Sequence, residues 1–146
     1  MKSLILSLAL ISASTSFAAT PSAPVAGQPT EALRLVHVGD LENWMKTSAT
    51  TLHIYDANND KTRQKEGLIP GAVALPSPSH YDVATTLPAD KSAKLVFYCA
   101  NTGCMASHDA AKMAIKAGYT DVSVMADGIE GWKKAGKTSE KFNKKS

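Results

Sequence analysis

The chain has 146 residues, of which 44% are hydrophobic and 20% are charged, and its formal net charge is +3. This length suits one domain rather than two, and the apolar share is large enough for a packed core, which excludes a disordered polar chain. The charges are nearly balanced and no arginine cluster is present, so the sequence offers no electrostatic footprint for nucleic acid.

The first 18 residues are typical of an export signal. Lys2 gives a basic start, residues 4–11 form a short apolar run, and Ser16-Phe17-Ala18 puts small residues where signal peptidase inspects them. The apolar run is too short to span a bilayer. We therefore expect cleavage after Ala18 and a periplasmic or secreted mature protein with no stable membrane insertion, while an uncleaved membrane anchor stays open as the alternative.

Three further parts follow the signal. Residues 19–32 are rich in Pro, Ser, Ala and Gly, so we expect a flexible linker there. Residues 33–137 are expected to form the folded domain. Residues 138–146 form a Lys-rich tail, which we expect to be a solvated end rather than a partner site.

Strand and helix patterns alternate along the domain. Strands are expected over residues 33–38, 51–55, 73–75, 94–98 and 122–125. Helices are expected from Asp40 as N-cap, over residues 61–66, 81–85 and 107–117, and in a last segment with Ile129, Trp132 and Ala135 on one face. This alternation predicts an α/β domain with a mostly parallel sheet. Ligands of such sheets bind beyond the carboxyl ends of the strands, where Asp56 and Cys99 stand.

Cys99 is the strongest candidate for a catalytic group. It follows a buried strand and precedes a loop that enters a helix, so loop N–H groups and the helix dipole can stabilise its thiolate. Its pKa would then fall below the free value of about 8.5. Gly103 would permit the backbone angles that such an anion-binding loop needs. The expected loop donors are Ala100, Asn101, Thr102, Gly103 and Met105, with Ser107 and His108 as supporting side chains. The alternative is that Cys99 is a small buried residue at a strand end.

Cys104 supplies a second thiol in the same loop. It can resolve Cys99 into a disulfide or receive sulfur from it, which gives a redox or thiol-exchange interpretation. An inert structural disulfide is the alternative, and both stay open here. The scattered histidines lack the paired spacing of a zinc site, and the polar residues after Asp56 lack the acidic series of a calcium loop, so no metal is expected.

Four motifs in this order resemble the rhodanese family. They are Tyr55-Asp56, the turn Gly67-Leu68-Ile69-Pro70-Gly71-Ala72, the segment Phe97-Tyr98-Cys99 with Ser107 and Ala110-Ala111, and the closing Asp127-Gly128-Ile129 with Trp132. The resemblance implies a three-layer α/β/α domain with a mostly parallel central sheet. It also implies sulfurtransferase chemistry through a cysteine persulfide on Cys99, and no metal or organic cofactor. By the same resemblance, Asp56 is a structural residue that accepts loop hydrogen bonds.

One departure from the family concerns charge. Ala106 stands where the family loop carries an arginine, and no Lys or Arg lies between Cys99 and Lys112. A phosphatase on a similar fold needs an arginine to clamp the phosphoryl oxygens, so its absence argues firmly against this class. Activity with thiosulfate, a dianion, is expected to be weak or absent.

These observations predict a sulfurtransferase or sulfur-relay protein that forms a persulfide on Cys99. Its partners would be a small sulfane-sulfur donor and a thiol acceptor, which can be a protein. Two alternatives remain: a non-catalytic rhodanese-like binding module, and a thiol-redox protein that uses Cys99 and Cys104.

Overall fold

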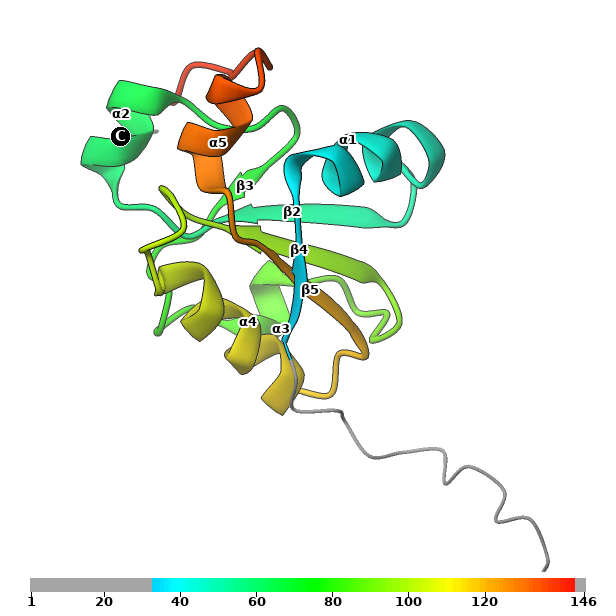
Figure 1. The fold of residues 1–146 in the computed structure, drawn as a ribbon. Helices are drawn as coiled ribbons and strands as arrows, with labels where there is room; N and C mark the ends of the chain where they lie inside the picture. The colour runs from blue at the N-terminus through cyan, green and yellow to red at the C-terminus, as the bar shows by residue number, and fades with distance from the viewer. Residues whose placement is uncertain (1–32, 144–146) are drawn as a thin grey trace, which may run out of the picture.

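The computed structural model describes residues 33–143 (Figure 1). Its elements follow the order β1 (Arg34–Val36), α1 (Val38–Thr47), β2 (Leu52–Asp56), α2 (Asp60–Glu66), β3 (Val73–Ala74), α3 (Val83–Thr86), β4 (Lys94–Tyr98), α4 (Ala106–Lys116), β5 (Asp121–Met125) and α5 (Gly128–Lys134). The predicted signal peptide, the predicted linker and the last three residues of the predicted tail lie outside the described residues.

The strands form one sheet in the order β1-β5-β4-β2-β3, and every strand pair is parallel. The prediction of an α/β domain with a parallel sheet is therefore confirmed. β4 lies at the centre, and its register sets Tyr98 beside Asp56 of β2 and beside Met125 of β5. The carboxyl ends of the three central strands thus meet at one edge of the sheet.

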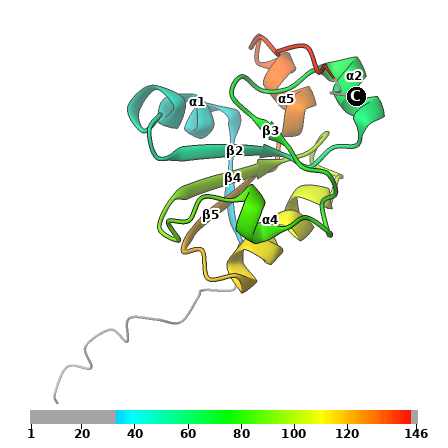
Figure 2. The ribbon, with the colours of Figure 1, turned by 180° about the vertical axis from the view of Figure 1, so that it is seen from behind.

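Helices cover both faces of the sheet, which gives three layers. Figures 1 and 2 show α1, α2 and α5 on one side and α3 and α4 on the other. Side chains of β4 alternate between the two cores: Leu95 and Phe97 pack with α4, while Val96 and Tyr98 pack with residues of α1 and α5. A strand buried on both faces explains the continuous apolar run from which β4 was predicted.

Two details of the helix predictions are wrong. The first helix begins at Val38, and its N-cap is His37 rather than Asp40. Asp40 lies in the first turn, where its carboxylate accepts the backbone N–H of His37 at 2.9 Å, the reciprocal half of a capping box. At the other end of the domain, Ala135 is exposed as the C-cap of α5, so only Ile129 and Trp132 of the predicted apolar face are buried.

The first residues of the predicted tail belong to the fold, contrary to our expectation. Glu140 and Leu68 exchange two backbone hydrogen bonds of 2.8 Å. The Trp132 indole donates to the Thr138 carbonyl at 2.8 Å, and the Ser139 hydroxyl donates to the Glu66 carbonyl at 2.8 Å. Figure 2 shows the end of the described chain returning to α2. These bonds satisfy backbone groups that a free tail would leave to water.

No helix within residues 33–143 combines the length and the apolar character that crossing a membrane requires.

Glu66 joins α2 to α5 through an ion pair whose pH dependence is testable. Its carboxylate accepts hydrogen bonds from Lys133 Nζ at 2.8 Å and from Lys65 Nζ at 2.7 Å. These bonds lower the pKa of Glu66 below 4.5. The ion pairs therefore stabilise the folded chain at neutral pH, and this stabilisation is lost as the pH falls below 4.5. We predict that Glu66→Gln lowers the melting temperature by a few degrees at pH 7 and leaves it nearly unchanged at pH 3.

Glu140→Gln is the matched control, because the Glu140 carboxylate makes no ion pair with another described residue. Thermal unfolding followed by circular dichroism at both pH values makes the comparison. An equal loss of melting temperature at pH 3 and pH 7 would contradict the electrostatic origin of the effect.

Candidate functional site

Cys99 lies directly after β4, at the edge of the sheet where the sequence placed it. Its sulfur is bonded to that of Cys104, and the two Cα atoms are 6.3 Å apart, within the usual range for a disulfide. Only 2% of Cys99 is exposed. Cys99 Sγ also lies 3.3 Å from the hydroxyl oxygen of Ser107, and 3.1 Å from the carbonyl oxygen of Cys104. In this state the sulfur is covered and bridged.

The loop after Cys99 differs from the predicted anion cradle. The N–H of Gly103 donates to the side-chain oxygen of Asn101 at 3.1 Å, and the N–H of Cys104 donates to the Asn101 carbonyl at 3.0 Å. Two loop N–H groups are therefore used within the loop itself. Gly103 also has no positive φ, so its conformational freedom is not needed there, contrary to our expectation. The sequence could not show that Asn101 competes for these donors.

Polar support for the sulfur comes instead from the start of α4. Ser107 is 1% exposed, and its hydroxyl is the only possible donor to the bridged Cys99 sulfur in their contact. The N-cap of α4 is Met105, which makes no side-chain cap hydrogen bond. The N–H groups of the first helical turn have no intrahelical acceptor, so this end of an 11-residue helix keeps partial positive charge. An anion at Cys99 is favoured by both features.

The start of α5 holds the base of the loop. The N–H of Ile129 donates to the Cys99 carbonyl at 2.9 Å, and the N–H of Glu130 donates to the Ala100 carbonyl at 3.0 Å. Gly128 has φ +66°, and a Cβ at this position would come within 2.4 Å of the Ala100 backbone. Glycine is thus required for this close approach. The sequence analysis noted Gly128 only as part of a motif and missed this contact.

Asp56 is the centre of a buried network beside the loop. It is fully buried and accepts the backbone N–H of Asn58 at 2.7 Å, as expected for a residue that orders its loop. Arg63, which the sequence analysis missed, donates its Nε to the same carboxylate at 2.9 Å. Its other donors reach Asp60 at 3.3 Å, the Asp56 carbonyl at 2.9 Å and the Leu75 carbonyl at 2.7 Å. Arg63 thus donates four hydrogen bonds to protein acceptors, and its charge is balanced by Asp56 and Asp60.

Tyr98 extends this network to the sheet. Its hydroxyl accepts the N–H of Ile69 at 3.0 Å and bonds to the carboxylate of Asp56. Burial, and then the charge of Asp56, raise the pKa of Tyr98 well above its ordinary value. Tyr98 therefore stays a neutral phenol, which suits a structural role rather than proton transfer.

His108 gives no evidence of a role at the sulfur pair. Its Nδ1 is buried without a hydrogen-bond partner in the described part of the chain, and among residues 33–143 no hydrogen bond joins His108 to either cysteine. Among residues 33–143, no cluster of three or more His, Cys, Asp or Glu side chains is arranged to hold a metal ion.

A cavity of about 510 Å³ opens beside the loop. Its lining comes from the loops after β2 and β3, from α2 and from the sulfur loop: Ala57, Asn58, Asn59, Asp60, Thr62, Arg63, Pro76, Ser77, Pro78, Ala100, Cys104 and Ala106. Cys104 lines this cavity and Cys99 does not. Its charged lining residues are Asp60 and Arg63, which pair with each other. Of the two cysteines, Cys104 is therefore the one that a solute in the cavity contacts.

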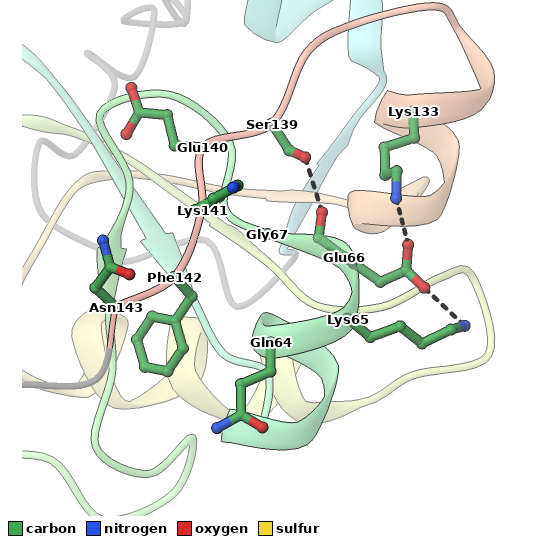
Figure 3. Close-up of a pocket in the computed structure, with 10 residues that line it drawn as sticks. All are labelled: Gln64, Lys65, Glu66, Gly67, Lys133, Ser139, Glu140, Lys141, Phe142 and Asn143. Carbon is green, nitrogen blue, oxygen red and sulfur yellow. Dashed lines mark hydrogen bonds and ion pairs between the residues drawn. The ribbon is translucent and has the colours of Figure 1, made fainter.

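A second hollow, of about 340 Å³, lies between α2, α5 and the end of the described chain (Figure 3). Lys65 and Lys133 point to the Glu66 carboxylate there, and Ser139 donates to the Glu66 carbonyl. The cysteines are not among its lining residues. Lys65 and Lys133 are paired with Glu66, so these two lysines serve the packing of α2 against α5.

The buried pair of Asp56 and Arg63 yields a stability prediction. Asp56→Asn leaves the Arg63 guanidinium, only 4% exposed, without its buried counter-charge. We expect a loss of about 3–5 kcal/mol in the free energy of unfolding, measured by urea denaturation. Asp60→Asn removes the more exposed partner of the same arginine, and we expect about 1 kcal/mol or less. Similar losses for both variants would contradict the central role of Asp56.

The unequal burial of the two sulfurs predicts where an external thiol attacks the disulfide. A small neutral monothiol, 2-mercaptoethanol, should form its mixed disulfide on Cys104 and free Cys99, because Cys104 lines the cavity. Brief reaction, alkylation of the released thiol and fragment mass spectrometry locate both modifications. The same reaction in urea is the control, since unfolding exposes both sulfurs and removes the preference. A mixed disulfide mainly on Cys99 in the folded protein would contradict the prediction.

Comparison with known proteins gives the same fold. Solved structures with matching folds include a Bacillus halodurans protein with 21% identity and TM-score 0.61, covering 71% of this chain and 74% of its own. A Rhodopseudomonas palustris protein described as a possible tyrosine phosphatase has 24% identity, TM-score 0.59 and coverages of 74% and 85%. A thiosulfate sulfurtransferase from Pseudomonas aeruginosa has 20% identity and TM-score 0.57, with 78% of this chain matching 22% of that one.

No curated protein is significantly similar to this chain. The family model for the rhodanese-like domain matches residues 37–135, which is more than half of the sequence and nearly all of the folded part. The resemblance drawn from the four sequence motifs is confirmed by this match. The chain belongs to the rhodanese-like domain family.

Proposed function

We propose that this protein is a sulfurtransferase or sulfur-relay protein that carries a persulfide on Cys99. The observation that carries the proposal is the position of the Cys99 sulfur: it follows the central strand, touches the Ser107 hydroxyl and stands at the uncapped start of α4. A hydroxyl donor and a helix N-terminus both favour a negative sulfur there. A persulfide is anionic at neutral pH, so the same hydroxyl and helix N-terminus stabilise it.

The disulfide must be reduced before Cys99 can react. The Cys99 thiolate then attacks the sulfane sulfur of a donor, a new S–S bond forms on Cys99, and the rest of the donor leaves with the electron pair of the broken bond. In the bridged state, Cys104 Sγ occupies the position of a second sulfur bonded to Cys99 Sγ. Room for one extra sulfur atom next to Cys99 therefore exists once Cys104 has withdrawn.

The charges around the site limit the class of donor. No Lys or Arg lies between Cys99 and Lys112, and the charge of Arg63 is balanced by its ion pairs with Asp56 and Asp60. A dianion such as thiosulfate would meet no free positive side chain. Hydropolysulfides and organic persulfides, which carry a single negative charge, fit this environment better, and a thiol would accept the sulfur.

We place this chemistry in the periplasm or outside the cell, on the evidence of the predicted signal in residues 1–18. A disulfide is compatible with such a compartment. After signal cleavage the protein would have no stable membrane insertion.

A thiol-redox function is the second candidate, and the Cys99–Cys104 disulfide is the observation that favours it. In that case the pair would exchange electrons with another dithiol and hold no sulfane sulfur. A non-catalytic binding module is the remaining alternative, and the missing loop cation favours it. Sulfur uptake distinguishes the proposed function from both.

The two cysteine variants are reduced, freed of reductant without air and mixed with inorganic polysulfide, and the gain of one sulfur atom on Cys99 is measured. Cys104→Ser should gain that atom and Cys99→Ser should not, because only Cys99 touches Ser107 at the start of α4. Intact-mass and fragment spectra give the number and the position of the added atoms. Thiosulfate in place of polysulfide should give roughly tenfold less adduct or none, because no free cation binds the dianion.

Circular dichroism of both variants controls for folding. If Cys104→Ser takes up no sulfur from any sulfane donor although it is folded, the persulfide function is wrong and the redox or binding alternatives stand.

A further inference from the structure

Cys104 is close enough to Cys99 to react with anything that Cys99 carries. The two Cα atoms are 6.3 Å apart, so the backbone as it stands permits a bond between the sulfurs. The chain has no other cysteine. The first acceptor that sulfur on Cys99 meets is therefore a thiol of the same loop.

The loop is built to keep Cys104 in this position. Asn101 accepts the N–H groups of Gly103 and Cys104, which closes the tip of the loop into a turn. At its base, α5 binds the carbonyls of Cys99 and Ala100. A thiol held this way has an effective concentration far above that of a free thiol in solution.

We propose that Cys104 is a resolving cysteine, which turns the sulfur carried by Cys99 into sulfide. This inference rests on the proposed persulfide. The Cys104 thiolate attacks the inner sulfur, Cys99 Sγ; the bond from Cys99 Sγ to the outer sulfur breaks, and the outer sulfur leaves as HS⁻. The two cysteines are oxidised to a disulfide and the sulfane sulfur is reduced to sulfide, so electrons and atoms balance. The product is the bridged pair of the structure.

The cavity completes the cycle. Its lining includes Cys104, Ala100 and Ala106, so sulfide released beside Cys104 has a way out to solvent. An external dithiol enters from the same side. Its first thiolate attacks Cys104 and releases the Cys99 thiolate, and its second thiol then displaces Cys104, leaving both cysteines reduced and the dithiol oxidised. The burial of Cys99 and the exposure of Cys104 to the cavity fit this order of attack.

The overall reaction is the reduction of sulfane sulfur to sulfide by a dithiol. A second reaction must reduce the oxidised dithiol again, so that it can react with this protein once more. A third reaction must use or remove the sulfide that is released.

The test compares wild-type protein with Cys104→Ser. Both are reduced, freed of reductant without air and given one equivalent of inorganic polysulfide. The wild type should return to the disulfide, with no added sulfur in its mass, and should release about one equivalent of sulfide more than the variant. Cys104→Ser should keep its added sulfur, with a lifetime on the order of 100-fold longer. Cys99→Ser controls for reaction of Cys104 alone.

Two results overturn the proposal, and they can be told apart. Wild-type protein that keeps the added sulfur as long as the variant, on either cysteine, shows that Cys104 does not resolve the persulfide, while sulfur carriage by the protein remains. No added sulfur on folded Cys104→Ser removes the persulfide itself, and this inference with it. The wild-type measurement decides the first case even if the variant folds poorly.

Discussion

The buried carboxylate of Asp56 is the constraint on which the candidate site depends. It ends β2, fixes Asn58 of the next loop, neutralises Arg63 from α2 and bonds to Tyr98 at the end of β4. A carboxylate and a guanidinium removed from water cost several kcal/mol each, and only full hydrogen bonding of both offsets that cost. The network therefore fixes one arrangement of the cavity wall beside Cys104 and, through β4, the position of Cys99.

The fold was predictable because its signals are local and repeated. The apolar run of β4 and the alternation of strands with helices gave the parallel sheet, and the four motifs gave the family. What failed depended on contacts distant in sequence. Ser139 and Glu140 looked like part of a solvated tail because their partners, Glu66 and Leu68, lie about seventy positions earlier. Arg63 was not singled out, since nothing near it in the sequence shows that it pairs with the buried Asp56.

The sequence predicted where the candidate site lies in the fold, but not how the loop hydrogen bonds are arranged around the cysteines. Cys99 at a strand end, Cys104 in the same loop and Ser107 on the following helix are readable from order alone. The turn over residues 101–103 decides whether the loop N–H groups point to the sulfur or to the side chain of Asn101. The amino-acid sequence does not specify the geometry of this turn. The sequence also shows that the loop has no cation. This absence argues against a dianionic sulfur donor such as thiosulfate, and it directs the functional proposal to the pair of cysteines.

The contact of Gly128 with the backbone of Ala100 has a consequence for how this loop can vary. The base of the loop is pinned by α5 and its far end is fixed where Ser107 enters α4, so insertions or deletions are tolerated only at the exposed tip, residues 101–103. Evolution or engineering can therefore change how Cys104 is presented by changing the size of this tip, while Cys99 at the strand end keeps its place.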